Sequence, residues 1–343
     1  MMKYFIIFIV LILWLGGCSA TMMKHLYKMG VIADDYRYGD LYRLSNLPQF
    51  RDPVHPCPDV YTVHRRTNVG SNLYVIGDSF TEPSRLSQQD FRAGQYLRVR
   101  WDDQLQVHLD TARQNILLIE TIERNFREHF SQPVTNFTVV DDTNPISIHN
   151  SSPAASPNRY ASLTRKIIDF IQAKNIEERL ETVLFSHDMF LWFREVKASI
   201  NLNWFDRVAP MVGISQDRKH LFVSLDTDTT KHQSSSFAPL PNRELSTLID
   251  NLNVSADRYR AAGFDAVFLS IIPNKTSILD PTQGCYNHLI ERVERNPRLR
   301  VPLVSVYDIY KKQSMSVYAL GDSHWSCTGR RIWLEILKDR AGL

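Results

Sequence analysis

The chain has 343 residues, of which 43% are hydrophobic and 22% charged, and its formal net charge is +3. This composition is that of a globular protein and excludes collagen, coiled coil and wholesale disorder. The small net charge gives no sign of a surface built for nucleic acid or another strong polyanion. A chain of this length forms one large domain or two small ones and buries a full core.

The N-terminus has the pattern of a secretory signal. A short basic start is followed by an apolar run over 4–15, which is well below the roughly 20 residues of a bilayer-spanning helix. The Leu-Gly-Gly-Cys segment ending at Cys18 resembles a bacterial lipobox, which implies removal of residues 1–17 and a lipid on Cys18. The alternative is an uncleaved N-terminal anchor. Both predict a membrane-anchored protein of the bacterial cell envelope that faces the periplasm or the exterior.

If Cys18 carries lipid, three cysteines remain, Cys57, Cys285 and Cys327. They allow one disulfide and one free thiol, and the sequence does not choose the pair. Cys57 lies between two prolines and suits a surface bridge, whereas Cys327 begins an expected helix and is either paired or simply buried. None has the C-x-x-C spacing of a structural zinc site, and no metal is expected.

Residues 18–70 are polar, aromatic and proline-containing, and they predict a lipid-anchored tether and an N-terminal arm. The remainder, 71–343, alternates apolar strand-like runs with helical patterns, which indicates a parallel sheet covered on both faces by helices. A stretch of about 131–214 has few strand signals and predicts a helical insertion. The expected strands are 72–76, 114–119, 220–225, 264–272 and 302–306. The expected helices are 121–130, 159–172, 176–200, 243–262, 286–293 and 327–337.

The first chemical candidate is the Gly-Asp-Ser-Phe segment 77–80, directly after the strand 72–76. Ligands and nucleophiles of parallel α/β sheets lie just beyond the C-terminal ends of strands. Ser79 would therefore stand at the rim of the sheet with its own N–H available to an oxyanion. The alternative is an ordinary Gly-Asp-Ser turn.

The second candidate is the segment Asp322-Ser323-His324 near the C-terminus. A serine nucleophile needs a neighbouring base, and the base needs a carboxylate that orients it. On an extended segment, Asp322 and His324 point to one side and Ser323 points away. His324 can then face Ser79 while Asp322 holds its other ring nitrogen, which makes Ser323 the poorer nucleophile. Taken singly, His324 also fits a structural, hydrogen-bonded histidine.

These two segments together resemble the SGNH hydrolase superfamily, and more narrowly its alginate O-acetyltransferase branch with an Asp-x-His-Trp motif. The strand that runs into Glu120, Glu123 and Arg124 is similar to the Glu-x-x-Glu-Arg strand of that branch. The segment 273–278 is similar to its Pro-Asp-Lys-x-x-Ile segment, with Asn in place of Asp. The motif order is circularly permuted, since the serine here comes first. The resemblance covers about 71–130 and 215–343, and no clear Gly-x-Asn-Asp block is present.

The resemblance implies a three-layer α/β/α sandwich of flavodoxin-like type with a mainly parallel sheet. It implies that Ser79 is acylated, that His324 moves the proton and that Asp322 orients His324. The activity would be a serine-dependent O-acyltransferase or esterase acting on cell-envelope or exported polysaccharide, without cofactor or metal. An acyl donor or a membrane acyltransferase would be a partner. The alternative is a non-catalytic polysaccharide-binding or assembly lipoprotein with a degenerate site.

By the same resemblance, five residues are candidate substrate contacts: Asp78, Glu120, Arg124, Lys275 and Trp325. For the Glu-x-x-Glu-Arg group we favour a structural ion-pair network, and for Trp325 a core position. Lys275 either reaches the site or caps a strand end. Two other groups are set aside. The side chains of Ser186-His187-Asp188 diverge and cannot form a triad, and Asp226 and Asp228 fit an exposed turn better than a cation site.

Overall fold

The protein was analysed as a computed structural model, which describes residues 38–52, 57, 70–140, 188–231 and 235–343, together with Tyr4, Ile7 and Phe8. The chain divides into two compact units. The first comprises Met1–Arg37, Tyr42–Leu47 and Ile146–Val208, and the second Tyr38–Leu41, Pro48–Pro145 and Ala209–Leu343. Cys18 and the expected helix 159–172 lie outside the described residues.

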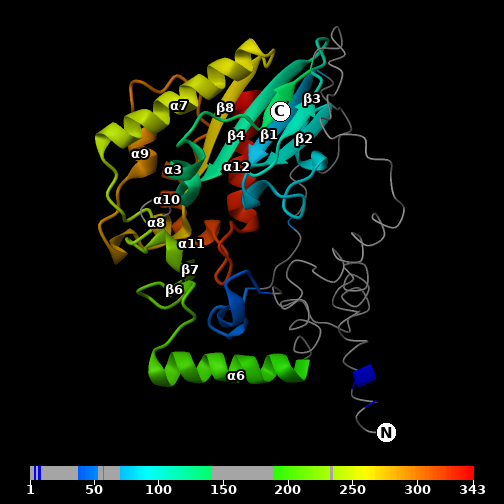
Figure 1. The fold of residues 1–343 in the computed structure, drawn as a ribbon. Helices are drawn as coiled ribbons and strands as arrows, with labels where there is room; N and C mark the ends of the chain where they lie inside the picture. The colour runs from blue at the N-terminus through cyan, green and yellow to red at the C-terminus, as the bar shows by residue number, and fades with distance from the viewer. Residues whose placement is uncertain are drawn as a thin grey trace. The chain divides into compact units, whose positions relative to one another are not determined.

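The second unit is an α/β structure built on a four-stranded sheet (Figure 1). Its strands are β1 (Ser71–Gly77), β2 (Gln95–Arg100), β4 (Gln114–Ile122) and β8 (Ala266–Ile272), in the order β2-β1-β4-β8. All three pairings are parallel. Every residue of β1 is buried, as expected for a strand covered on both faces. The prediction that 72–76, 114–119 and 264–272 share one sheet is confirmed.

The edge strand β2 was not predicted. Its sequence, Gln-Tyr-Leu-Arg-Val-Arg, mixes polar and apolar residues, and only Val99 is buried. An edge strand needs no continuous apolar run, so it gives a weak sequence signal. The expected strand 302–306 is reduced to an isolated bridge between Leu303 and Leu269. Val304 N donates to Leu269 O at 2.8 Å.

Two small sheets lie apart from the central one. β3 (Leu105–Val107) pairs in parallel with β5 (Phe137–Val139), and β6 (Val212–Ile214) pairs antiparallel with β7 (Leu221–Val223). The expected strand 220–225 is therefore present as β7, but it belongs to a hairpin-like pair and not to the parallel sheet.

Most of the described helices lie in the C-terminal half of the chain. Their bounds are α3 Phe126–His129, α6 Asp188–Phe205, α7 Asn242–Ala261, α8 Lys275–Leu279, α9 Leu289–Glu294, α10 Tyr307–Lys312, α11 Ser314–Val317 and α12 Cys327–Ala341. Short 3-10 turns are η1 Tyr42–Asn46, η2 Ser79–Thr81, η3 Gln88–Asp90, η4 Glu123–Asn125, η5 Ser224–Asp226 and η6 Pro281–Gln283. The expected helix 121–130 is wrong at its start, since β4 continues to Ile122 and a 3-10 turn follows. Within the described part of the chain, no helix is long and apolar enough to cross a bilayer.

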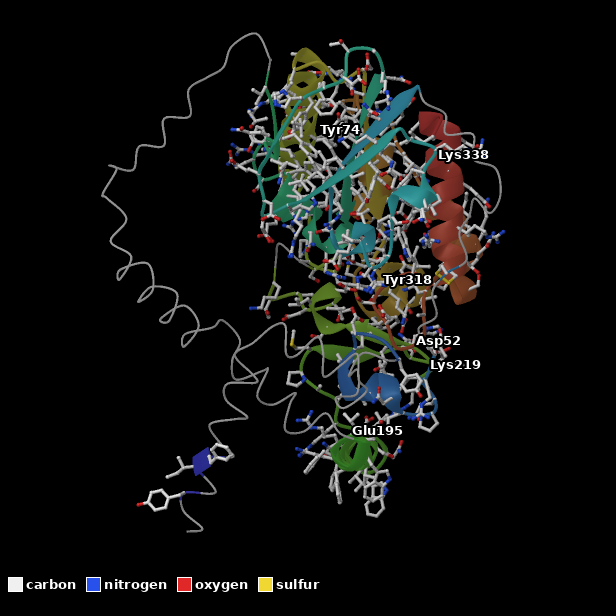
Figure 2. The ribbon with its side chains drawn as sticks, turned by 90° about the vertical axis from the view of Figure 1, so that its right-hand side faces the viewer. Asp52, Tyr74, Glu195, Lys219, Tyr318 and Lys338 are labelled. Carbon is white, nitrogen blue, oxygen red and sulfur yellow. A yellow bond between two sulfur atoms is a disulfide. The ribbon has the colours of Figure 1, made fainter. Side chains whose placement is uncertain are left out.

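The long helix α7 follows its predicted pattern. Its expected apolar face is buried, with Leu245, Leu248, Ile249 and Leu252 all in the core. Gly263 follows the helix with a φ of 108°, which confirms it as the residue at which the helix ends. Tyr74 lies among the strands of the sheet (Figure 2) and meets the ring of Phe264 edge-on at 5.2 Å.

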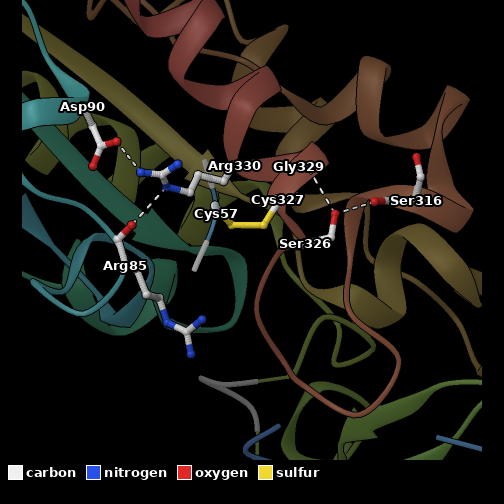
Figure 3. The surroundings of a disulfide bond; sticks show 8 residues. All are labelled: Cys57, Arg85, Asp90, Ser316, Ser326, Cys327, Gly329 and Arg330. Atoms are coloured by element: carbon white, nitrogen blue, oxygen red, sulfur yellow. Dashed lines mark hydrogen bonds and ion pairs between the residues drawn. A yellow bond between two sulfur atoms is a disulfide. The ribbon is translucent and has the colours of Figure 1, made fainter. Parts of the chain in front are cut away.

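A disulfide joins Cys57 to Cys327, the first residue of α12, with their Cα atoms 5.2 Å apart (Figure 3). Cys327 is therefore paired and not simply buried. Cys285 is exposed and free. The bridge spans 270 positions and ties the N-terminal arm to the last helix.

We expect Cys57→Ser to lower the free energy of unfolding by about 2–5 kcal/mol, the usual loss when a native disulfide is removed. Urea unfolding followed by circular dichroism measures it. Cys285→Ser is the matched control and should leave the midpoint unchanged. Equal midpoints for the Cys57→Ser variant and the native chain would show that the bridge does not constrain the unfolded state.

Candidate active site

Ser79 lies where β1 leaves the sheet. The strand ends at Gly77, and Ser79 begins the 3-10 turn η2. Its Oγ lies 2.8 Å from Nε2 of His324, a residue 245 positions away. The predicted contact between the two segments is confirmed, and it occurs at the C-terminal edge of the parallel sheet.

Asp322 and His324 lie in the loop between α11 and α12. Asp322 Oδ1 lies 2.7 Å from His324 Nδ1 and also accepts the backbone N–H of His324 at 2.8 Å. The carboxylate thus closes a tight local turn and holds the ring with one oxygen. Both residues are buried, each about 6% exposed. The geometry predicted for Ser79, His324 and Asp322 is therefore present in full.

Lys275 holds the loop that carries His324. Its ammonium donates to three carbonyl oxygens, those of Ala319 at 2.5 Å, Leu320 at 2.7 Å and Asp322 at 3.1 Å. Burial lowers the pKa of Lys275 to about 7. Neither of the two roles expected for Lys275 fits fully, because its side chain binds the backbone of the loop 319–322 and does not contact Ser79 or His324.

Glu120 supports the turn that carries Ser79. Its Oε2 accepts the N–H of Asp78 at 2.8 Å and the hydroxyl of Thr81 at 3.2 Å. A Cβ at Gly77 would collide with the Thr81 hydroxyl and lie 2.8 Å from Glu120 Oε2, so only glycine fits there. Burial, followed by the neighbouring Asp78, raises the pKa of Glu120 well above its usual range.

Asp78 joins the turn after β1 to the end of β4. Its Oδ2 accepts the N–H of Ile122 at 2.8 Å, and its Oδ1 accepts from Asn125 Nδ2 at 3.2 Å. Burial raises the pKa of Asp78 despite these bonds. Asp78 lines the cavity beside Ser79, but both of its carboxylate oxygens accept hydrogen bonds from the protein itself.

Glu123 and Arg124 both make structural contacts, but with different partners. Glu123 is fully buried and accepts the N–H of Asn274 at 2.9 Å and the hydroxyl of Tyr286 at 2.8 Å. Arg124 pairs instead with Asp226 at 3.2 Å. Asp226 was expected in an exposed turn, which is wrong, because it is 1% exposed. The Arg124 guanidinium explains how a carboxylate can be buried there.

Trp325 belongs to the core. It is 6% exposed and packs edge-on against Phe80, with ring centroids 4.9 Å apart, and against Trp333 at 5.3 Å. Phe80 in turn contacts the His324 ring at 4.7 Å. Trp325 therefore acts on the site through Phe80, which restrains the imidazole from one side.

A cavity of about 570 Å³ opens beside Ser79. Its lining combines charged, amide and aromatic side chains, including Arg98, Asn125, Trp101 and His129. The rings of Trp101 and His129 are stacked with centroids 3.8 Å apart. Burial lowers the pKa of His129 to about 4, so its ring is neutral at neutral pH. Ser79 thus borders a polar cavity, whose lining does not include His324.

Sequence reasoning missed two charged residues at His324 Nδ1. Asp40 Oδ2 lies 3.3 Å from this nitrogen, and Arg85 Nη2 lies 2.8 Å from it. Neither belongs to a motif, and no local pattern could have found them. Ser323 was expected to point away, which is wrong, because its Oγ lies 3.3 Å from Nδ1. Ser323 is still not beside Nε2, where the nucleophile must stand.

The surroundings of His324 favour its charged form. Burial lowers the pKa of His324, but hydrogen bonds to Asp322 and then to Asp40 outweigh burial and raise the pKa above its usual value of 6.5. Ligand atoms of Asp40, Asp322 and His324 all lie within 4.8 Å of one another, a spacing that also suits a cation site. Arg85 and the Ser323 hydroxyl already compensate these carboxylates, so we assign the cluster to hydrogen bonding.

Comparisons of the chain with protein-family models, with curated proteins and with solved structures each found no match.

Proposed function

We propose that this protein is a serine-dependent O-acyltransferase or esterase with Ser79 as nucleophile. The observation that carries the proposal is the continuous chain from Ser79 Oγ through both nitrogens of His324 to Asp322, at 2.8 and 2.7 Å. Ser79 and His324 are 245 positions apart, so no local constraint brings them together. Nucleophile, base and orienting carboxylate in this order define the activation of a weak hydroxyl nucleophile.

In the first step Ser79 Oγ attacks the acyl carbonyl and His324 Nε2 takes its proton. The collapsing intermediate expels the donor alcohol, which receives that proton from His324, and leaves an acyl ester on Ser79. An acceptor hydroxyl or water then reverses the sequence and regenerates the serine. Asp322 accepts the hydrogen bond from Nδ1–H throughout and stabilises the imidazolium that forms in both steps.

An oxyanion donor is supplied by the backbone N–H of Ser79. As the first residue of η2, Ser79 occupies a position whose N–H has no partner within the turn. Arg98 Nη2 donates to the carbonyl of Asp78 at 2.7 Å, which fixes the peptide plane between Asp78 and Ser79. Since carbonyl and N–H of one peptide point in opposite directions, this bond aims the Ser79 N–H away from Arg98.

We further infer a three-layer α/β/α arrangement related to the SGNH hydrolases, with permuted motif order. Trp333 of α12 donates to Ser270 of β8 at 2.9 Å, which puts α12 on one face of the sheet. Tyr259 of α7 contacts the ring of Phe264 at 5.7 Å, and Phe264 meets Tyr74 of β1. The register and the alternation of side chains assign Tyr74 and Ser270 to opposite faces. This supports helices on both faces.

The proposed substrate is a cell-envelope or exported polysaccharide, with an acyl donor or a membrane acyltransferase as partner. A polar cavity beside the nucleophile suits a sugar hydroxyl. The disulfide between Cys57 and Cys327 fits an oxidising, extracytoplasmic compartment. The rival is a binding or assembly lipoprotein whose triad does not turn over.

The lipid anchor is tested separately. We expect Cys18→Ser to move the protein from the membrane fraction to the soluble fraction, because the lipid on Cys18 would be its attachment. Fractionation and mass spectrometry of the mature N-terminus measure this. A membrane-bound mature chain that still begins at Met1 would contradict lipidation and favour the uncleaved anchor.

The decisive experiment for the proposed function is intact mass spectrometry after incubation with p-nitrophenyl acetate. We expect a single acetyl adduct that peptide mapping assigns to Ser79. An acetyl group found only on lysines, at the rate of chemical modification, would favour the binding-protein alternative.

A further inference from the structure

We infer that Asp40 is a second orienting carboxylate for His324 and that it sets the charge of the site together with Asp322 and Arg85. Asp40 lies N-terminal to the sheet, in the segment 38–41. The inference rests on the proposed function, because it assigns Asp40 a role in positioning the catalytic base. It names a residue that no motif predicts.

Asp40 is held by the catalytic loop itself. Its Oδ1 accepts the backbone N–H of Ser323 at 2.7 Å, and its Oδ2 accepts the Ser323 hydroxyl at 2.5 Å. The same Oδ2 lies 3.3 Å from His324 Nδ1. The carboxylate therefore bridges the loop backbone and the imidazole.

The backbone around Asp40 is fixed as well. Leu41 N donates to Gly321 O at 3.3 Å. Gly39 adopts a φ of 128°, and a Cβ at this position would collide with the carbonyl group of Gly321. The close approach of two backbones on either side of Asp40 leaves its side chain little choice of direction.

Arg85 explains why one carboxylate is insufficient here. Its Nη2 lies 2.8 Å from His324 Nδ1 and 3.8 Å from Asp322 Oδ1, so its positive charge offsets that of Asp322. With Asp40 present, the three charged side chains at Nδ1, Asp40, Asp322 and Arg85, sum to one negative charge, as in a simple triad. Lys275 faces the same loop from α8, where its ammonium donates to the carbonyl of Asp322 at 3.1 Å. The backbone carbonyl of Arg85 accepts from Arg330 Nε at 3.0 Å. Figure 3 shows that the Arg85 guanidinium points away from Arg330.

The tautomer of His324 depends on the same balance. Ser79 can donate to Nε2 only when the ring proton is on Nδ1. Arg85 has only donors, so at Nδ1 it favours the unprotonated nitrogen and hence the unreactive tautomer. Asp322 and Asp40 are acceptors and favour the reactive one. Asp40 thus opposes Arg85 at the nitrogen that decides whether Ser79 is activated.

The pKa shifts of Asp40 and His324 have the directions expected from this geometry. Burial raises the pKa of Asp40, but hydrogen bonds to His324 and Ser323 outweigh it and hold the pKa well below its usual range. For His324, the hydrogen bond to Asp40 raises the pKa and the charge of Arg85 lowers it. Asp40 is thus an anion across the working range of pH.

The test is the pH dependence of kcat/KM for p-nitrophenyl acetate. The rate requires neutral His324 and falls as the pH drops below its pKa, so the native acid limb should lie above about pH 6.5, the usual value. Asp40→Asn should lower kcat/KM about 10- to 100-fold, by analogy with the loss when the carboxylate behind a metal-binding histidine is removed. It should also move the limb to lower pH, and Arg85→Gln should move the limb to higher pH.

The double variant with Asp40→Asn and Arg85→Gln separates charge from structure. It should bring the limb back toward its native position, because Asp322 is then no longer offset. Asp228→Asn is the matched control, because this half-buried carboxylate bonds to Thr230 and not to His324, and the change should leave the acid limb in place. The inference is overturned if the acid limb does not move in Asp40→Asn. It is also overturned if the acid limb of the double variant stays where it lies in Asp40→Asn.

NMR titration of His324 tests the role of Asp40 independently of the proposed acyl-transfer activity. If the native protein shows no turnover that depends on Ser79, the proposed function fails, yet Asp40→Asn must still lower the measured pKa of His324. If Asp40→Asn does not fold, Ser323→Ala removes one bond to Asp40 and should lower that pKa by less. An unchanged pKa in the folded variant would refute the role of Asp40 whatever the activity.

Discussion

Replacing Ser79 or His324 by alanine should each abolish acyl transfer from p-nitrophenyl acetate while the protein stays folded. Ser79→Ala removes the atom that receives the acyl group. His324→Ala removes the base 2.8 Å from it, and a serine without its base is almost unreactive at neutral pH. Loss of either member of such a pair typically costs on the order of 10⁶-fold in kcat.

The matched control is Ser326→Ala, a serine of the same C-terminal segment that caps α12 through Gly329 N. It should retain activity and lose only stability, about 0.5–2 kcal/mol for a lost helix cap. Circular dichroism and acyl-adduct mass spectrometry separate the two effects. Full activity in Ser79→Ala would leave the non-catalytic alternative as the better account of the site.

The contact between Ser79 and His324 was predictable because both residues lie in short, local patterns. Ser79 follows an apolar run that can only be a buried strand, and parallel strands bring their C-terminal ends to one edge. His324 and Asp322 stand two positions apart, close enough for one to hold the other. The sequence could not say that the link is a tight turn in which Asp322 Oδ1 accepts the His324 N–H. That turn is why Ser323 faces Nδ1 and not solvent.

The supporting charges were not predictable, since each acts over a long sequence distance. Asp40 reaches Ser323 across 283 positions, and Arg85 reaches His324 across 239. Asp226 was misjudged for the same reason: its partner Arg124 is 102 positions away. The strand β2 was not predicted because an edge strand can be polar. Buried charge and sheet edges are set by tertiary partners, which hydrophobic periodicity does not report.

Asp322→Ala should lower kcat/KM on the order of 10⁴-fold, as expected when the orienting carboxylate of a triad is removed. The change leaves both the His324 N–H and Nδ1 without their acceptor at 2.8 and 2.7 Å.

Asp322→Asn should cost less than Asp322→Ala, because the two donors share one oxygen, Oδ1. An amide oxygen in that place can accept both bonds, so the reactive tautomer of His324 survives and only the negative charge is lost. Asp40 Oδ2, 3.3 Å from Nδ1, then supplies the remaining charge. Steady-state kinetics of the two variants, with folding checked by circular dichroism, decide the matter. An asparagine variant as slow as the alanine variant would mean that the amide turns its NH₂ group to Nδ1 and that Asp40 does not hold the ring.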